Sequence, residues 1–381
     1  MGEVYFGTGE AFSPEELDDF LNYVFGFNGK DRDFAEMFPQ IHRPEAKANR
    51  KNLVAAEDGR LLAAVGSYPR TLIVGEERLS VVGIGNVAVH PRTRGRGYMK
   101  RLMADALEAM IREGADLSDL GGQRQRYQHF GYEVAGAPVS FRVSPRTAAH
   151  YFRGRARRPI AFLPLREGER EDLWDQAYAL YEKKLCRIDR SRKEFPLILR
   201  THYRQPQAVL ENGRFLGYFT GELGELTLAD PADLGGVVCR YAELRGEVTF
   251  PVAPWEKAML REAASFAEEA ILAYHAKINV FHFGRTVRAF LKLKASLEKL
   301  VDGEMILLIH GFAGGEKLRI TVAGGVPAVA EAAPEAIPDA GLGQLEAIRF
   351  FFGVYSPERE EIPLSRDWFP LPFAVERADH V

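Results

Sequence analysis

The chain has 381 residues, and 46% of them are hydrophobic, which is enough to fill the cores of roughly two or three domains. This composition excludes a disordered protein, and 36 glycines without a three-residue period exclude a collagen-like one. With 50 basic and 53 acidic residues the net charge is −3, which argues against a nucleic-acid partner, since such a partner needs a wide basic face.

The cysteines and the apolar runs indicate the compartment. Cys186 and Cys239 lie far apart without a C-x-x-C pair, so a disulfide framework and a zinc ribbon are excluded. No apolar run approaches ~18 residues, and the first residues, M-G-E-V-Y-F, do not resemble a signal peptide. We therefore expect a cytoplasmic protein without a membrane partner.

The first elements read clearly. Ser13, Pro14 and Glu16 form the start of a helix over 13–25, because Ser is a good N-cap and Glu stands three residues later. Residues 53–65 predict two strands around an Asp-Gly turn, and 70–79 and 82–89 predict two more. Three acidic residues follow the first helix and could attract a cationic amine, although such residues are usually just solvated: Asp31, Asp33 and Glu36.

Residues 87–103 run from a buried strand through an Arg/Gly loop into a helix with a 3.6-residue apolar period, and Gly114 predicts its end. A strand at 115–120 and another at 139–143 follow. Four arginines within 153–158 could bind phosphate, but a solvated linker over 145–158 is the better interpretation.

A short repeat suggests duplication. E-D-G-R-L-L at 57–62 recurs as E-N-G-R-F-L at 211–216, an offset of 154 residues, although chance competes with this interpretation. The same offset carries 92–99 onto 246–253, which lack the Arg/Gly loop. A second copy would therefore be structural.

The last third predicts a small α+β region. A helix is expected over 286–301 and another over 341–352, separated by strands and a Pro/Ala loop at 331–340. The expected strands are 304–310, 317–323 and 326–330. The tail from 363 is so rich in Pro and aromatic residues that we expect it to pack on the protein.

The Arg/Gly loop carries the chemistry. Gly95 and Gly97 let the backbone approach a ligand, and the N–H groups at the start of the following helix favour an anion. Arg92, Arg94 and Arg96 add positive charge, so the loop predicts a pyrophosphate cradle. It is neither a P-loop nor a dinucleotide fingerprint, since both glycine patterns are missing.

This stretch resembles the GNAT acetyltransferase superfamily, which binds acyl-coenzyme A through Arg/Gln-x-x-Gly-x-Gly/Ala between a strand and a helix. Arg92 fits the pattern literally, with Gly95 and Gly97. Pro91, however, selects Arg94-x-x-Gly97-x-Met99, because the superfamily usually carries a Pro three residues before the Arg. Met99 then departs from the small residue of the general pattern.

A second motif strengthens the resemblance. Y-Q-H-F-G-Y-E at 127–133 is similar to the Tyr-x-x-x-Gly-Phe/Tyr of GNAT domains, in which the phenol donates a proton to the departing thiolate. The resemblance implies that Tyr127 is the general acid and that acetyl-CoA is the co-substrate, without a metal. It assigns coenzyme binding to Val87, Ala88, Val89, Arg94, Gly95, Arg96, Gly97, Tyr98, Met99 and Lys100.

The layout resembles the enhanced-intracellular-survival (Eis) family. The implied fold is α+β: a catalytic GNAT domain at 1–147, a degenerate GNAT-like domain at 148–284, and a sterol-carrier-like domain at 285–381. In that family the C-terminal carboxylate is the general base, which here would be that of Val381. Asp379 and His380 are competing candidates for the base. The alternative to all three is a frayed tail that has no role in catalysis. The strand at 83–89 contains no carboxylate of its own, so the base must come from elsewhere.

The resulting interpretation is an N-acetyltransferase that moves an acetyl group from acetyl-CoA directly to a primary amine of a small molecule or peptide. The resemblance also implies a homo-oligomer. His275 and His282 lack metal-like partners and are expected to be structural. Two other interpretations stay open: a protein that senses acyl-CoA and binds an apolar ligand without turnover, and a transferase that uses aminoacyl-tRNA, which the intact loop and the net charge disfavour.

Overall fold

The computed structural model describes residues 2–29, 32–272, 274 and 276–381, so the expectations for Asp31 and His275 lie outside it. The chain divides into two compact units. The first unit comprises Met1–Gly136, Ala276–Phe373 and His380–Val381, and the second comprises Ala137–His275 and Ala374–Asp379. The sequence-based division at 147/148 and 284/285 stays a prediction.

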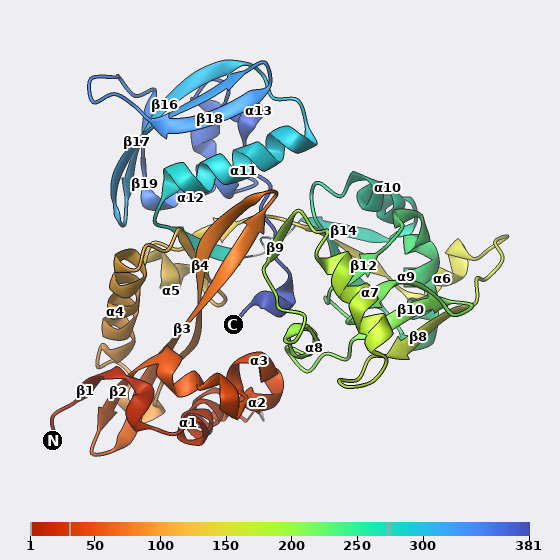
Figure 1. Cartoon of the computed structure of the whole chain (residues 1–381), viewed down its shortest axis with the longest axis horizontal. Helices are drawn as coiled ribbons and strands as arrows, with labels where there is room; N and C mark the ends of the chain where they lie inside the picture. The colour runs from red at the N-terminus through yellow and green to blue at the C-terminus, as the bar shows by residue number, and fades with distance from the viewer. Residues whose placement is uncertain (1, 30–31, 273, 275) are drawn as a thin grey trace. The chain divides into compact units, whose positions relative to one another are not determined.

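A twisted sheet forms the centre of the first unit, with strands in the order β1-β2-β3-β4-β5-β15-β6 (Figure 1). Neighbouring strands are antiparallel except β4 and β5, which are parallel. The strands are β1 (Tyr5–Thr8), β2 (Asn52–Glu57), β3 (Arg60–Val74), β4 (Glu77–Val89), β5 (Leu117–Leu120), β6 (Glu133–Ala135) and β15 (Ala276–Val280).

The long β3–β4 hairpin corrects one prediction. The expected strand at 70–79 is wrong, because the chain turns at Gly75, whose φ of 58° is left-handed. Val74 pairs with Glu77 directly across this turn. A Gly-Glu-Glu run between two long apolar runs is a weak turn signal, so the sequence pattern did not indicate where β3 ends and β4 begins.

Helices cover both faces of this sheet. One layer contains α1 (Pro14–Gly26), α2 (Phe34–Met37) and α3 (Pro39–His42), which pack with Ala88 of β4. The other contains α4 (Tyr98–Arg112), which packs with Ile84 of β4, and α5 (Arg124–Gln128). The helices predicted over 13–25 and after Gly97 are confirmed, the first by a complete capping box.

The second unit contains two smaller sheets, β12-β11-β10-β8 and β13-β7-β14. Its strands are β7 (Val139–Val143), β8 (Ile160–Pro164), β9 (Cys186–Ile188), β10 (Gln207–Glu211), β11 (Arg214–Phe219), β12 (Leu226–Leu228), β13 (Val248–Val252) and β14 (Glu269–Leu272). Its helices are α6 (Pro145–Tyr151), α7 (Glu171–Tyr181), α8 (Phe195–Leu199), α9 (Leu234–Arg245) and α10 (Lys257–Phe266). The linker expected at 145–158 is therefore wrong in its first half, where Ser144 caps α6.

The two units share one hairpin arrangement around the recurring sequence motif. In each, a hairpin turns at the recurring motif, with left-handed Asp58-Gly59 in the first unit and Asn212-Gly213 in the second. In the second unit β7 lies between β13 and β14, and in the first unit β15 lies between β5 and β6.

The constant offset beyond the hairpin is wrong. Residues 246–253 follow α9 and contain strand β13, whereas the counterpart of the Arg/Gly loop lies before α9. The reason is length: β4 has 13 residues and β12 has 3.

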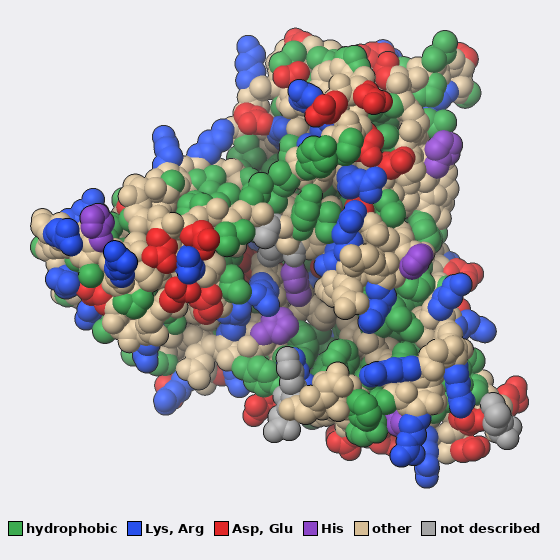
Figure 2. Space-filling model, turned by 180° about the vertical axis from the view of Figure 1, so that it is seen from behind, with side chains coloured by type: hydrophobic (Ala, Val, Ile, Leu, Met, Phe, Trp, Pro, Cys, Tyr) green, Lys and Arg blue, Asp and Glu red, His purple; other side chains and the backbone are tan. Residues whose placement is uncertain are grey.

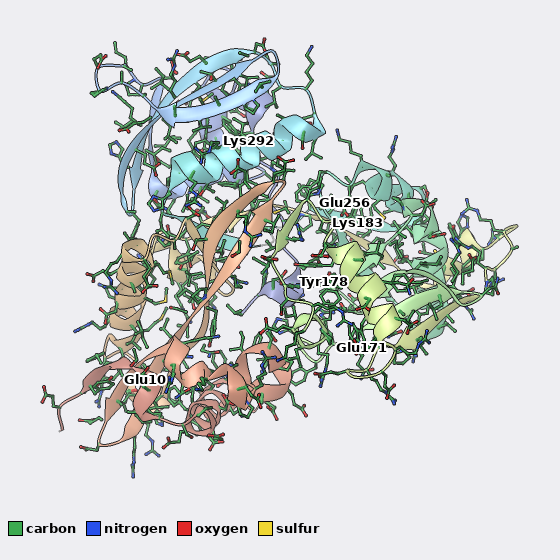
Figure 3. The ribbon with its side chains drawn as sticks, in the orientation of Figure 1. Glu10, Glu171, Tyr178, Lys183, Glu256 and Lys292 are labelled. Atoms are coloured by element: carbon green, nitrogen blue, oxygen red, sulfur yellow. The ribbon has the colours of Figure 1, made fainter. Side chains whose placement is uncertain are left out.

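The C-terminal part of the first unit is a sheet in the order β18-β17-β16-β19, with α11 along one face (Figure 1). Its strands are β16 (Gly303–Gly311), β17 (Gly314–Ala323), β18 (Val326–Glu331) and β19 (Ala340–Gly343), and its helices are α11 (Phe283–Leu297), α12 (Gln344–Phe352) and α13 (Ser365–Trp368). Lys292 of α11, labelled in Figure 3, lies 2.6 Å from the Glu77 carboxylate at the start of β4. The apolar tail packs as predicted, with Trp368, Phe369 and Leu371 buried.

Short 3-10 turns complete the loops: η1 (Gly9–Ala11), η2 (Pro44–Ala46), η3 (Ala48–Lys51), η4 (Pro91–Thr93), η5 (Pro231–Asp233), η6 (Pro357–Glu360) and η7 (Arg377–Asp379). Figure 2 shows basic and acidic side chains interspersed over the visible face, as the near-zero net charge predicts. Among the helices that the structure describes, none is long and apolar enough to cross a bilayer.

Candidate active site

β4 separates from β5 partway along its length. The two strands pair in parallel from Val81 with Leu117 to Ile84 with Leu120, where β5 ends. β4 continues to Val89, so its residues 85–89 extend beyond this pairing. On the other side, the register with β3 shifts between Ala64 and Gly66, which makes a bulge in the ladder opposite residues 85–88. Backbone groups at Val87–Val89 are therefore available to a ligand on the β5 side.

The loop after β4 is tied down at its base. Thr93 donates its hydroxyl hydrogen to the carbonyl of His90 at 3.1 Å, and the His90 ring accepts from the Arg92 N–H at 3.2 Å. Gly95 and Gly97 then adopt left-handed φ values of 83° and 81°. A side chain at either position would be strained, which explains the two glycines.

The N-terminus of α4 opens onto this loop. Gly97 is the N-cap, and the first bond within the helix runs from the Arg101 N–H to the Gly97 carbonyl at 3.0 Å. The N–H groups before Arg101 point out of the helix end, where the helix dipole favours an anion. Arg94, Arg96 and Lys100 are exposed beside it. The structure thus brings together the loop residues that the sequence singled out.

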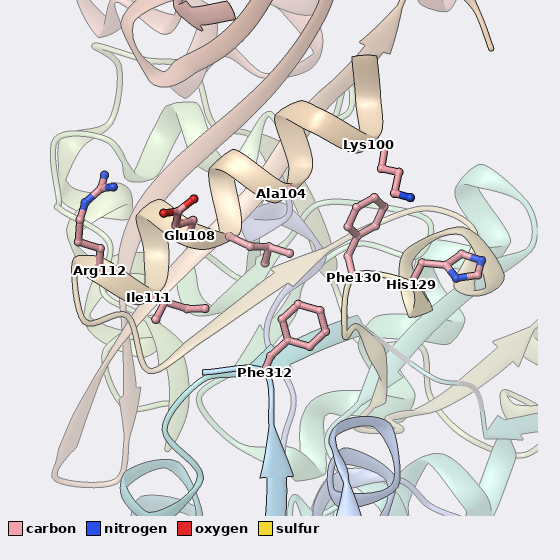
Figure 4. Close-up of a pocket in the computed structure, with 9 residues that line it drawn as sticks. Lys100, Ala104, Glu108, Ile111, Arg112, His129, Phe130 and Phe312 are labelled. Carbon is pink, nitrogen blue, oxygen red and sulfur yellow. The ribbon is translucent and has the colours of Figure 1, made fainter. Parts of the chain in front are cut away.

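A hollow of about 580 Å³ follows α4 (Figure 4). One face of the helix, from Lys100 to Arg112, forms one wall, and His129, Phe130 and Phe312 form the other. Most of this lining is apolar, with Lys100 and His129 near one end in the close-up.

Tyr127 lies on α5 and is 6% exposed. Its ring belongs to the same hydrophobic cluster as Ile84 of β4, and Val87 and Met99 pack against that cluster. Burial raises the pKa of Tyr127, and the neighbouring Arg126 opposes this effect only in part. The phenol therefore keeps its proton throughout the neutral range.

Val381 lies against the opposite face of β4. A Cβ built at Gly85 would lie 2.8 Å from the carboxyl carbon of Val381, and one at Gly83 would lie 2.5 Å from its side chain. Val381 also packs against the cluster that contains Tyr68 and Ala88. The structure therefore places Tyr127 and Val381 on opposite sides of one strand, rather than in contact.

The competing base Asp379 is already engaged within the second unit. Its two carboxylate oxygens accept from Arg190 at 2.8 and 2.9 Å, and Arg190 also contacts Glu225 at 3.0 Å. Both Arg190 and Asp379 are buried. A carboxylate held by a guanidinium in this way is a poor proton acceptor.

The second unit lacks the loop that the first unit has. Between β12 and α9 the chain reads A-D-P-A-D at 229–233, with neither glycine nor arginine. Asp230 caps the following turn through the Ala232 N–H at 2.9 Å. This stretch differs from 246–253, where the sequence placed the missing loop, and the structural role of this copy stays a prediction.

A buried polar group at the bulge was missed from the sequence. Asn86 has a left-handed φ of 55°, and its amide lies 2.5 Å from the hydroxyl of Tyr68. His42, 44 residues earlier, completes this group together with Asp18. These residues are too far apart in sequence for a motif to reveal them. Among the described residues, no group of three or more His, Cys, Asp or Glu side chains could hold a metal ion.

Comparisons with known proteins agree with this geometry. Residues 13–135 match the family model of an acetyltransferase (GNAT) domain. No curated protein sequence matches the chain.

Solved structures share the fold over the whole length. A GCN5-related N-acetyltransferase from Kribbella flavida is 16% identical, with a TM-score of 0.67 over 100% of this chain and 98% of that one. A GCN5-related N-acetyltransferase from Anabaena variabilis is 14% identical, with a TM-score of 0.68 over 100% of both chains. Eis1 from Mycobacterium abscessus is 14% identical, with a TM-score of 0.62 over 100% of both chains. These likenesses confirm the predicted fold class.

Proposed function

We propose that the first unit transfers an acetyl group from acetyl-CoA directly to an amine. The geometry of β4 supports this proposal best. This strand separates from β5 beside a bulge and leads into a glycine-arginine loop at the N-terminus of α4, within a region that matches the GNAT acetyltransferase model. A strand with a free edge and a helix start with free N–H groups suit an extended coenzyme with a pyrophosphate.

The coenzyme would lie along these elements. Arg94, Gly95, Arg96, Gly97, Tyr98, Met99 and Lys100 would hold the pyrophosphate, and the backbone of Val87, Ala88 and Val89 would hold the thioester arm. The hollow along α4 begins at Lys100, so it would take the adenosine end. The thioester carbonyl would accept a hydrogen bond from a backbone N–H of the bulge, which stabilises the negative charge that develops on its oxygen.

Acid and base serve different atoms in this reaction. The amine nitrogen attacks the thioester carbon, the C–S bond breaks, and the amine loses one proton to the base while the thiolate gains one from the Tyr127 hydroxyl. Solvent then exchanges both protons. Because the sulfur and the amine lie on different sides of the carbonyl, an acid and a base on opposite faces of β4 suit the chemistry. We propose the carboxylate of Val381 as the base, supported by its position against Gly85.

The substitution Tyr127→Phe tests the acid. It removes one hydroxyl and leaves the buried ring in place, so we expect kcat to fall by about a hundredfold or more with little change in the melting temperature. Tyr241→Phe, a half-buried tyrosine of the second unit, is the matched control and should keep full turnover. Full activity of Tyr127→Phe with an unchanged pH profile would exclude this role.

The remaining assignments are part of the same proposal. We propose a small-molecule or peptide amine as acceptor, a sterol-carrier-like role for the C-terminal part of the first unit, and assembly into a homo-oligomer. Cys186 and Cys239 are both free and buried, which supports a reducing, cytoplasmic location. Tight binding of acetyl-CoA without release of thiol in the presence of any amine would instead support an acyl-CoA sensor.

A further inference from the structure

A line of buried polar side chains leads from α1 to the bulge of β4. The Asp18 carboxylate lies 2.5 Å from Nδ1 of His42, and Nε2 of the same ring lies 3.4 Å from the side-chain amide of Asn86. That amide donates to the Tyr68 hydroxyl at 2.5 Å. Nδ1 of His42 thus faces a carboxylate, and Nε2 faces the amide group of Asn86, an arrangement that suits a ring with its proton on Nδ1.

A second asparagine holds the group from another side. Asn52 donates to the Tyr68 hydroxyl at 3.1 Å and to the Ala48 carbonyl at 2.7 Å, and its own carbonyl accepts from Asn86 at 3.4 Å. His42, Asn52, Tyr68 and Asn86 are all buried. Burying polar groups costs free energy that apolar side chains would avoid, and a connected network of this kind fixes one geometry instead.

The residue at the end of the line needs such support. A left-handed φ is costly for any residue except glycine, and Asn86 adopts it where the ladder between β3 and β4 is broken. The side-chain bonds of Asn86 hold this backbone conformation. The conformation in turn sets the direction of the next backbone N–H, that of Val87, at the point where β4 is free of β5.

The group is suited to positioning rather than to moving a proton. An amide cannot pass a proton on, so Asn86 ends any relay from His42. The His42 ring is sealed from solvent and lies edge-on to Phe34, with ring centres 5.4 Å apart. Asp18 is the charged group that contacts this ring, with its side chain 17% exposed.

We propose that Asp18, His42 and Asn86 are positioning residues for acyl transfer: they lock the bulge of β4 so that its backbone N–H meets the thioester carbonyl. The inference rests on the proposed function. We call the side-chain contacts of Asp18, His42 and Asn86 the lock. The lock acts on the N–H group that faces the reacting carbonyl and does not contact the pyrophosphate loop, so its loss should lower kcat without weakening the binding of the coenzyme.

The test compares Asn86→Gly, His42→Ala and His42→Gln with the wild type. Glycine keeps the left-handed backbone accessible but removes the lock, and glutamine can still donate to Asp18 and accept from Asn86. We expect kcat to fall by about tenfold to a hundredfold in Asn86→Gly and His42→Ala, with KM for acetyl-CoA within about twofold, and to recover largely in His42→Gln. Asn49→Ala is the control, because Asn49 is a buried asparagine whose amide bonds the Phe12 carbonyl at 2.7 Å. Wild-type kcat in Asn86→Gly, or equal losses in the control, would overturn the inference.

Hydrogen exchange over residues 84–90 separates this inference from the proposed function. Faster exchange in Asn86→Gly but not in Asn49→Ala is expected, because loosening the bulge exposes its N–H groups. If the wild type shows no turnover with any amine, the proposed function fails, and exchange alone decides whether the lock exists. Unchanged exchange in Asn86→Gly would then overturn the lock as well.

Discussion

The substitution Gly85→Ala tests the position of the terminal carboxylate. A Cβ at Gly85 would lie 2.8 Å from the carboxyl carbon of Val381 and 3.1 Å from its oxygen, whereas ordinary contacts begin near 3.4 Å. The carboxylate must therefore move by about 0.6 Å or more. A Cβ there would also lie 3.2 Å from the ring of Tyr68, which is packed among buried side chains and has little room to retreat.

The expected loss follows from this displacement. A misplacement of about 1 Å at a reacting group costs roughly a hundredfold in rate, so a shift of about half that size should cost about tenfold in kcat. The affinity for acetyl-CoA should not change, since the loop at 94–100 is separate from Gly85. Overpacking should also lower the free energy of unfolding by about 1–3 kcal/mol.

Steady-state kinetics of four proteins provide the assay: wild type, Gly85→Ala, deletion of Val381, and both changes together, each checked by intact mass so that the last residue is known. If both changes act through one carboxylate, the double variant should be no slower than the slower single variant. Gly26→Ala is the control, because a Cβ there meets nothing within 4 Å. Full kcat in Gly85→Ala, or losses that multiply, would refute the assignment of Val381 as base.

Two further predictions concern stability. Burial raises the pKa of Glu133, but hydrogen bonds, of which that from Arg124 is the strongest, outweigh burial and lower the pKa from 4.5 to about 2. The ionised carboxylate therefore stabilises the fold above pH 4.5, and this stabilisation is lost as the pH falls toward 2. In urea titrations, the difference in unfolding free energy between wild type and Glu133→Gln should shrink over that range. Arg190→Ala leaves the buried Asp379 carboxylate without its guanidinium and should destabilise the second unit by about 3–5 kcal/mol. The control Arg170→Ala removes an exposed ion pair and should have a much smaller effect in the same titrations. Equal effects of the two substitutions would contradict the buried pairing.

Local signals predicted much of the fold. Ser13 and Glu16 form the expected capping box, and the apolar period after Gly97 forms α4. The recurring Asp-Gly and Asn-Gly turns form equivalent hairpins, because each needs two residues with left-handed φ. These features depend on neighbours in the chain, so the sequence alone reveals them.

Long-range pairings were beyond local patterns. β15 completes the first sheet between β5 and β6, which lie more than 100 positions earlier in the sequence. The sequence of a five-residue strand does not indicate with which strand it pairs. The site divides in the same way. The Arg/Gly loop is local and was predicted, whereas the contact of Asn86 with His42 exists only after α3 has packed on the sheet.

Direct acetyl transfer to an amine can be tested by thiol release from acetyl-CoA across polyamines, aminoglycosides and Lys peptides, with initial rates taken at varied concentrations of both substrates. Direct transfer predicts thiol release that depends on the amine and intersecting double-reciprocal lines, because both substrates must be bound together. Tight binding of acetyl-CoA with no release in the presence of any amine, or parallel lines that indicate an acetylated enzyme, would contradict it.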